Sequence, residues 1–374
     1  MTDMKEKNLF GGARRGWLGT LIAAAIVVGV APSTASAADC GDAAGSGGAR
    51  VACACGDTVV TSTYLRSSDP VVQNQCAGLG LAIGRSGITL DCRYNEMNGD
   101  GTDHGIYVFE RERVAVKRCT VKGFLDGIRV GFGGSNSIYG NTVADNADDG
   151  IGVRDSDGNR IRYNKVSGNG ESGIDLSTAD GNSVYANKAY GNAATGVELG
   201  QNSNKNWVKK NYCKNNGKQG IQLSDDSGWN KVYLNWMSHN GSNGLLAKNS
   251  GHNSIMWNAA KDNGGDGLRL LEGSPSNYIK GFYAAGNGAD GICVGSDSNK
   301  VMLSTAIDNG SDGVQNEATG EKNSYYANYS KENADYGYHD NSSGGGTAGT
   351  ANRYSRNRCR NNGIDGSDPD GLCR

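Results

Sequence analysis

A glycine followed by an apolar–x–apolar triplet recurs along this chain at a nearly constant interval. Five consecutive copies begin at glycines that lie 23, 23, 23 and 24 residues apart, at Gly127, Gly150, Gly173, Gly196 and Gly220. Further copies begin at Gly267 and Gly291, with weaker ones at Gly244, Gly313 and Gly337. A fixed repeat of this length is typical of stacked structural units, so the sequence predicts a solenoid.

Asparagine recurs in three columns that keep the same interval. One column lies four residues before each repeat glycine, a second five residues earlier and a third five residues earlier again, as in Asn146, Asn141 and Asn136. Asparagine tolerates the left-handed backbone that a sharp corner requires. Its amide can also bond the same amide one coil above. Three corners and three short strands per coil predict an all-β fold, a right-handed single-stranded parallel β-helix with coils of about 22–24 residues.

Between the corners, apolar and polar residues alternate as in half-buried strands. The expected inward column contains only β-branched residues, namely Ile138, Ile161, Val184, Val208, Val232, Ile255, Ile279 and Val301. A leucine-rich repeat would need a leucine framework, which is absent, and a propeller blade would need about forty residues.

Residues 1–37 have the pattern of a secretory signal peptide. Four basic residues precede an apolar run from Trp17 to Ala31, and Ala35-Ser36-Ala37 forms a small-x-small cleavage site. Export through either the general or the twin-arginine route fits this pattern. The protein is therefore expected to be secreted or periplasmic, with cleavage near Ala37.

Removal of this segment leaves 33 basic against 37 acidic residues, a balance that argues against a nucleic-acid partner. No later apolar run is long enough to span a bilayer.

All ten cysteines lie after the cleavage point, as expected for an oxidising compartment. We expect Cys92 to pair with Cys119, since they end two strands about one coil apart, and Cys359 with Cys373. The remaining N-terminal pairing stays open. Cys213 falls on an inward position, where a small buried thiol is expected. Cys293 falls on an outward position, so these two cysteines should not bond each other. The predicted organisation is a cysteine-rich, disulfide-bonded N-terminal cap with the first irregular coils (38–104), a regular β-helix (105–340), and a flexible insertion, last coil and C-terminal cap (341–374).

The coils from about Ile88 to Asn333 resemble the parallel β-helix repeats of the pectate-lyase-like superfamily, in particular the NosD-type, carbohydrate-associated repeats. Cys55-Gly56-Asp57-Thr58-Val59 and Gly87-Ile88-Thr89-Leu90 are similar to the opening of secreted bacterial β-helix proteins. The resemblance implies the fold, but the superfamily includes lyases, hydrolases, epimerases and non-catalytic members.

One candidate catalytic group lies on the strand that follows the repeat glycine. Its outward position carries Asp175 and Glu198 in consecutive coils, with Arg154 diagonally near. Paired carboxylates could divide acid and base roles or hold Ca²⁺. In the superfamily's lyases, acidic residues bind calcium and an arginine takes the proton. The alternative is a solvated face on which two like charges adjoin.

No other cofactor is expected. The aspartates before the repeat glycines, such as Asp126 and Asp149, are interpreted as turn residues. The histidines and methionines do not cluster as copper handling would require, so no metal site is predicted from them.

A second candidate surface gathers aromatic and basic side chains on the two other strands of each coil. Its residues are Arg162, Tyr185, Trp207, Lys209, Tyr233 and Trp236. Flat rings can stack on sugars, and basic groups can pair with carboxylate or sulfate. Tyrosine and lysine are also common on ordinary exposed strands, which is the alternative interpretation.

The favoured function is that of a secreted, monomeric protein that binds an extracellular acidic polysaccharide and has no clear catalytic centre. The alternatives are a polysaccharide lyase, hydrolase or epimerase that uses the outward carboxylates, and a structural or surface-adhesion scaffold.

Overall fold

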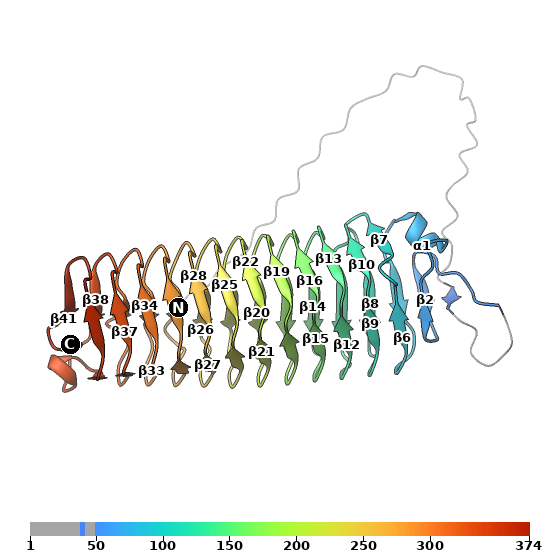
Figure 1. Ribbon diagram of the computed structural model, residues 1–374. Coiled ribbons are helices and arrows are strands. Elements are labelled where there is room, and N and C mark those ends of the chain that lie inside the picture. The colour runs from blue at the N-terminus through green and yellow to red at the C-terminus, as the bar shows by residue number, and fades with distance from the viewer. Residues whose placement is uncertain (1–37, 42–48) are drawn as a thin grey trace, which may run out of the picture. The chain divides into compact units, whose positions relative to one another are not determined.

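The chain winds into a solenoid in which every regular coil contributes one strand to each of three parallel sheets (Figure 1). The computed structural model describes residues 38–41 and 49–374, so the signal peptide predicted for residues 1–37 lies outside the described residues. The predicted all-β, right-handed parallel β-helix is confirmed. Helix is confined to α1 (Pro70–Gln73) and one 3-10 turn (Thr347–Gly349) in the described residues.

The sheets are here numbered in the order in which a coil enters them. Sheet 1 contains β1 (Asp39–Cys40), β2 (Asp57–Val59), β5 (Leu81–Ile83), β8 (Ile106–Phe109), β11 (Ile128–Gly131), β14 (Ile151–Arg154), β17 (Ile174–Ser177), β20 (Val197–Gly200), β23 (Ile221–Ser224), β26 (Leu245–Lys248), β29 (Leu268–Leu270), β32 (Ile292–Val294), β35 (Val314–Asn316), β38 (Tyr336–Asp340) and β41 (Asp365–Asp368). Sheet 2 contains β3 (Thr63–Tyr64), β6 (Thr89–Asp91), β9 (Ala115–Lys117), β12 (Ser137–Tyr139), β15 (Arg160–Arg162), β18 (Ser183–Tyr185), β21 (Trp207–Lys209), β24 (Lys231–Tyr233), β27 (Ser254–Met256), β30 (Tyr278–Lys280), β33 (Lys300–Met302), β36 (Ser324–Tyr326) and β39 (Arg353–Ser355). Sheet 3 contains β4 (Gln75–Cys76), β7 (Glu96–Gly99), β10 (Thr120–Lys122), β13 (Thr142–Ala144), β16 (Lys165–Ser167), β19 (Lys188–Tyr190), β22 (Tyr212–Lys214), β25 (Trp236–Ser238), β28 (Ala259–Lys261), β31 (Tyr283–Ala285), β34 (Thr305–Ile307), β37 (Tyr329–Lys331) and β40 (Arg358–Arg360).

The core is the stack of inward side chains. Every residue of the predicted inward column, from Ile138 to Val301, is fully buried. The register places Ile138 opposite Ile161 and Ile161 opposite Val184, so like residues stack on like from coil to coil. Strict alternation along each three-residue strand leaves the two flanking side chains outside.

The asparagine columns form buried hydrogen-bonded ladders, as predicted. The Asn187 side-chain amide donates to Asn211 Oδ1 at 3.1 Å, and Asn164 donates in the same way to Asn187 at 3.0 Å. Many of these amides also donate to a backbone carbonyl. Asn187 Nδ2, for example, donates to the Ile161 carbonyl at 2.9 Å.

The prediction that the asparagine itself takes the left-handed backbone is wrong. That conformation belongs to the residue just before it, for example Ala186 (φ 54°) before Asn187 and Lys210 (φ 56°) before Asn211. The corner turns one residue earlier because the asparagine must point its amide into the ladder.

Both ends of the solenoid carry disulfides. The predicted pairs Cys92–Cys119 and Cys359–Cys373 are present, and Cys40–Cys53 and Cys55–Cys76 complete the N-terminal set. At the C-terminal end, buried tyrosines replace the aliphatic core. The Tyr325 hydroxyl donates to Asn316 Oδ1 and the Tyr354 hydroxyl to Asp340 Oδ2, each at 2.8 Å.

The two free thiols both lie away from solvent. Cys213 is inward and buried, as expected, and burial raises its pKa to about 12. Cys293 lies in the outward column of sheet 1, yet it is also buried. Its Sγ lies 3.3 Å from Gln315 Oε1 and 3.6 Å from Glu317 Oε1, since these longer side chains cover it.

Within residues 38–41 and 49–374, no helix has the length and apolar character that crossing a membrane requires.

Replacing Asn187 by Ala should lower the free energy of unfolding by about 2–4 kcal/mol, because the buried Asn164 N–H and Ile161 carbonyl lose their partner. Equilibrium denaturation measures the loss. Asn341→Ala, at an exposed asparagine outside the ladders, is the matched control. Equal effects of the two substitutions would contradict a stabilising role for the ladder.

Candidate functional site

Two acidic side chains lie next to each other on the outer side of sheet 1. Asp175 of β17 and Glu198 of β20 are direct partners in the parallel register. Arg154 pairs with Ser177, two residues beyond Asp175, and thus lies diagonally to the carboxyl group. The structure therefore brings together the three residues that the sequence predicts as a catalytic group.

Neutral donors hold Glu198. The Ser172 hydroxyl donates to its Oε2 at 3.0 Å, and the Gln222 amide donates to its Oε1 at 2.8 Å. Both carboxylate oxygens are thereby fixed in place, so Glu198 presents a positioned negative charge to its neighbour.

Asp175 is poised to exchange a proton near neutral pH. Burial, followed by the negative charge of Glu198, raises the pKa of Asp175 to about 7, although the guanidinium groups of Arg129 and Arg154 oppose the shift. A carboxyl group with a pKa near the working pH suits general acid or base catalysis.

A second carboxyl group, Asp149, shares this environment. Burial, followed by the negative charges of Asp175, Asp126 and Asp148, raises the pKa of Asp149 to about 9, and the Ser172 N–H, 3.0 Å from Asp149 Oδ1, opposes the shift. Asp149 is therefore protonated at neutral pH and can donate a proton. The sequence interpretation of Asp149 as a turn residue did not include this property.

Arg129 also belongs to the group, although it is not among the catalytic residues predicted from the sequence. It lies two coils before Asp175 in the outward column, and the coil between them has Gly152 at that position. A side chain at Gly152 would begin 2.8 Å from Arg129 Nη1, so the glycine provides the space into which Arg129 extends. Arg129 also donates to Asp126 Oδ2 at 3.2 Å. The sequence signal that could have identified Arg129 is Gly152, a glycine within a column of large polar residues.

Three aspartates at the corner before sheet 1 could hold a cation. Asp126, Asp148 and Asp149 can each bring one carboxylate oxygen to within 4.8 Å of the others. Oxygen ligands of this kind suit Ca²⁺, which the sequence predicts only for the case of a lyase. The same residues also serve the corner itself, since the Asp149 N–H donates to Asp126 Oδ1 at 3.2 Å.

The predicted aromatic and basic residues lie mainly on sheet 2. One outward column runs Tyr139, Arg162, Tyr185, Lys209 and Tyr233, so that rings and cations alternate from coil to coil. The Arg162 guanidinium lies 5.1 Å from the Tyr139 ring centre, and the Lys209 ammonium lies 4.7 Å from the Tyr233 ring centre. These distances are those of cation–π pairs.

Trp207 lies in the other outward column of sheet 2. Lys231 of the next coil places its ammonium 4.6 Å from the indole, and the Tyr233 ring packs edge-on at 6.0 Å. Trp236 lies on the next sheet, where it pairs with Tyr212 of β22. Five of the six predicted binding residues therefore share sheet 2, and Trp236 lies around the corner on sheet 3.

Charge is segregated around the cross-section of the solenoid. From β9 and β10 to β39 and β40, no strand of sheets 2 and 3 contains an aspartate or glutamate. The same strands carry Lys117, Lys122, Arg160, Arg162, Lys165, Lys188, Lys209, Lys214, Lys231, Lys261, Lys280, Lys300, Lys331, Arg353, Arg358 and Arg360. We call these outward faces of sheets 2 and 3 the basic–aromatic face. In contrast, acidic residues lie on sheet 1 and on the two corners beside it, for example Asp148, Asp157 and Asp226.

Known structures and family models agree with this architecture. The model described as a right-handed beta helix region matches residues 79–237. The A-module of mannuronan C-5 epimerase AlgE6 from Azotobacter vinelandii is 16% identical, with 84% of this chain and 86% of that chain covered and a TM-score of 0.55. The Dettilon tailspike protein is 15% identical, with 83% and 62% covered and a TM-score of 0.56. A mutant of the periplasmic alginate epimerase AlgG is 14% identical, with 69% and 81% covered and a TM-score of 0.52. No curated protein sequence matches the chain. At these identities the likeness shows the right-handed parallel β-helix fold alone.

The raised pKa values predict that alkali destabilises the fold. Asp149 and Asp175 have folded-state pKa values of about 9 and 7, against about 3.9 in an unfolded chain. The folded state therefore binds more protons, and the free energy of unfolding falls as pH rises from about 4 through 9. Asp149→Asn should raise the melting temperature at pH 8 and leave it nearly unchanged at pH 4.

Thermal unfolding in EDTA measures this difference without interference from bound cations. The exposed Asp308→Asn is the control, since it removes one charge elsewhere. A destabilised Asp149→Asn variant at pH 8 would contradict the burial of a neutral carboxyl group.

Proposed function

We propose that the chain is an exported protein that binds an acidic polysaccharide along its basic–aromatic face. The observation that carries this proposal is the charge segregation. The chain has two more acidic than basic residues overall, yet the strands of sheets 2 and 3 from β9 and β10 to β39 and β40 contain no acidic residue. In the described residues, no ion pair with an acidic side chain engages Arg162, Lys209 or Lys231. Such unpaired cations raise the local concentration of an anionic partner.

The spacing of the face suits a polymer. Because successive coils are about 4.8 Å apart, a chain that lies along the solenoid axis meets a ring and a cation in turn, and many weak contacts act together. Aromatic rings stack on the apolar faces of sugars, so the rings of this face suit a polysaccharide. Two structural neighbours carry names that state an epimerase activity on alginate or mannuronan, and this supports a polysaccharide as the ligand class.

The four disulfides support an oxidising compartment, in accordance with the signal peptide that the sequence predicts.

A second candidate function rests on a separate observation. Asp175 and Asp149 have pKa values of about 7 and 9 in one cluster, so one can act as a base while the other keeps its proton. With Arg129 and Arg154 beside them, these groups could abstract and return a proton on a uronic-acid sugar. The outcome would be a lyase or an epimerase whose substrate lies on sheet 1.

Binding on sheet 2 predicts that Lys209→Gln/Lys231→Gln weakens retention on an immobilised acidic polysaccharide. We expect a several-fold to tenfold rise in Kd, from roughly 1 kcal/mol of lost charge and cation–π contact. The residual binding should also depend less steeply on salt. Affinity electrophoresis or biolayer interferometry measures both.

Lys218→Gln/Lys248→Gln is the charge-matched control, because neither lysine lies on a strand of sheet 2 or 3. If both double variants lose affinity equally, the effect is one of net charge and the face is not the site. A neutral polysaccharide of the same length should bind neither variant differently from the parent.

Catalysis on sheet 1 predicts that product formation from acidic polysaccharides rises as pH passes about 7 and that Asp175→Asn abolishes it, since Asp175 must be ionised to take a proton. Unsaturated ends, reducing ends and proton NMR of inverted sugars should be followed together, with and without Ca²⁺. Full activity in the Asp175→Asn variant would exclude the cluster as a catalytic centre. Binding without any product in the parent protein would leave the binding function alone.

A further inference from the structure

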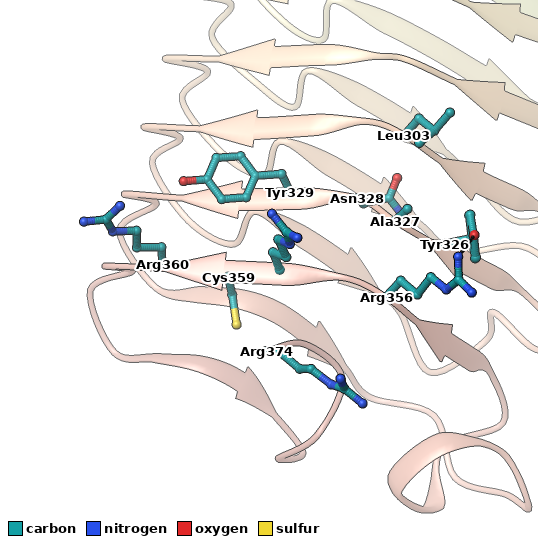
Figure 2. Close-up of a pocket in the computed structure, with 10 residues that line it drawn as sticks. Leu303, Tyr326, Ala327, Asn328, Tyr329, Arg356, Cys359, Arg360 and Arg374 are labelled. Carbon is teal, nitrogen blue, oxygen red and sulfur yellow. Dashed lines mark hydrogen bonds between the residues drawn. The ribbon is translucent and has the colours of Figure 1, made fainter.

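The basic–aromatic face ends in a pocket near the C-terminus. The pocket has a volume of about 750 Å³ and lies where β36 and β37 meet β39 and β40. Its walls come from Tyr326 to Tyr329 on one coil and from Arg356, Arg358 and Arg374 on the other side (Figure 2). The pocket therefore opens on the corner between sheets 2 and 3, in line with the face described above.

A change in side-chain size makes this corner concave. The corner positions of three consecutive coils are Leu303, Ala327 and Arg356, all with φ between 53° and 57°. The long side chains of Leu303 and Arg356 flank the short side chain of Ala327, and Figure 2 shows the three on successive turns. The hollow over Ala327 is thus bounded by an apolar wall on one side and a guanidinium on the other.

Cations dominate the lining. Arg356, Arg358, Arg360 and Arg374 are all exposed, and no aspartate or glutamate lines the pocket. Among the described residues, none of these arginines forms an ion pair with an acidic side chain. All four arginines line the pocket, and in Figure 2 the Arg360 side chain extends away from the labelled Arg356 and Arg374.

The arginines are partly preorganised. Arg356 Nη1 donates to the Tyr326 hydroxyl at 2.8 Å, and the guanidinium lies 5.6 Å from that ring centre. Arg374 is tied to the last coil through its backbone, since its N–H donates to the Asn357 carbonyl and its backbone oxygen accepts from the Cys359 N–H. The Cys359–Cys373 disulfide fixes the residue next to it. Ordering that precedes binding lowers the entropic cost of binding.

We propose that this arginine pocket is an anion-binding subsite that holds oxyanion groups, carboxylate or sulfate, on the last sugars of a polysaccharide lying along the face. The inference rests on the proposed function and adds to it a terminal anchor. Guanidinium groups pair with such oxyanions in two-point fashion, and the tyrosine rings Tyr326 and Tyr329 offer surfaces for the sugars. The anchor fixes where along the solenoid the polymer ends.

Short oligomers test the pocket separately from the long face. Isothermal titration with trigalacturonate, sulfated maltotriose and neutral maltotriose measures the affinity of the parent protein and of Arg356→Gln/Arg374→Gln. We expect the variant to bind the charged trimers at least roughly tenfold more weakly and the neutral trimer to bind neither protein. The better of the two charged trimers identifies the oxyanion. Arg356→Lys/Arg374→Lys should recover part of the affinity, because it keeps the charge and loses the two-point geometry.

Arg85→Gln/Arg113→Gln, at exposed arginines far along the sequence from the pocket, is the charge-matched control and should bind the trimers as the parent does. Equal affinity of the parent and the Arg356→Gln/Arg374→Gln variant, or an equal loss in the control, overturns the subsite.

Long-polymer binding separates the two proposals. If Lys209→Gln/Lys231→Gln weakens polymer binding while the arginine substitutions leave trimer affinity unchanged, binding along the face is supported and the terminal anchor is excluded. If only the arginine variant loses affinity for polymer and trimers, the arginine pocket binds the anion and the rest of the face does not contribute.

Discussion

The stacking of coil upon coil through buried asparagine amides is the constraint on which the rest of this structure depends. Asn164, Asn187 and Asn211 each donate to, and accept from, the neighbouring coil within a desolvated corner. A buried amide that lost its partner would cost more than the bond contributes, so each coil is held to its neighbours at one register. Register in turn fixes columns, and every outward side chain has a neighbour at about 4.8 Å above and below.

Because side chains stack in columns, an uncompensated charge lowers the stability of the fold. At the corner before sheet 1, three aspartates stack from coil to coil, namely Asp266, Asp290 and Asp312. Each carboxylate accepts a hydrogen bond from a backbone N–H of the next coil. Burial and these neighbours raise the pKa of Asp290 to about 6. Asn243 occupies the same position and accepts the same kind of bond, at 2.7 Å, without any charge. The ladder therefore does not need a carboxyl group, and the cluster around Asp149 contains more carboxyl groups than the corner requires. That excess is the physical reason to consider sheet 1 a site.

The sequence predicted the fold because each coil repeats the same local pattern. The pattern consists of a β-branched inward residue, an amide at each corner and a glycine before the next strand. The pairing of Cys92 with Cys119 followed from the same coil length. What the columns could not reveal was the reach of long side chains. Arg129 extends across Gly152, and Gln315 covers Cys293. In both places a long side chain from a neighbouring coil fills the space beside a short residue. The arginine pocket was hidden for a similar reason, since Arg374 enters it only after the chain turns back along the last coil.

The alternation of rings and cations on sheet 2 can be understood in the same terms. Like charges directly opposite each other on parallel strands destabilise a sheet. Tyr185 separates Arg162 from Lys209, so these two cations lie about twice the strand spacing of ~4.8 Å apart, close to the Debye length at physiological ionic strength. Around these residues, sheet 2 can thus stay basic without acidic partners at a tolerable cost in stability. An ordinary exposed sheet would achieve the same relief with interspersed glutamate and aspartate. Their absence from these strands leaves a positive surface whose remaining repulsion is relieved when an anionic chain lies along it.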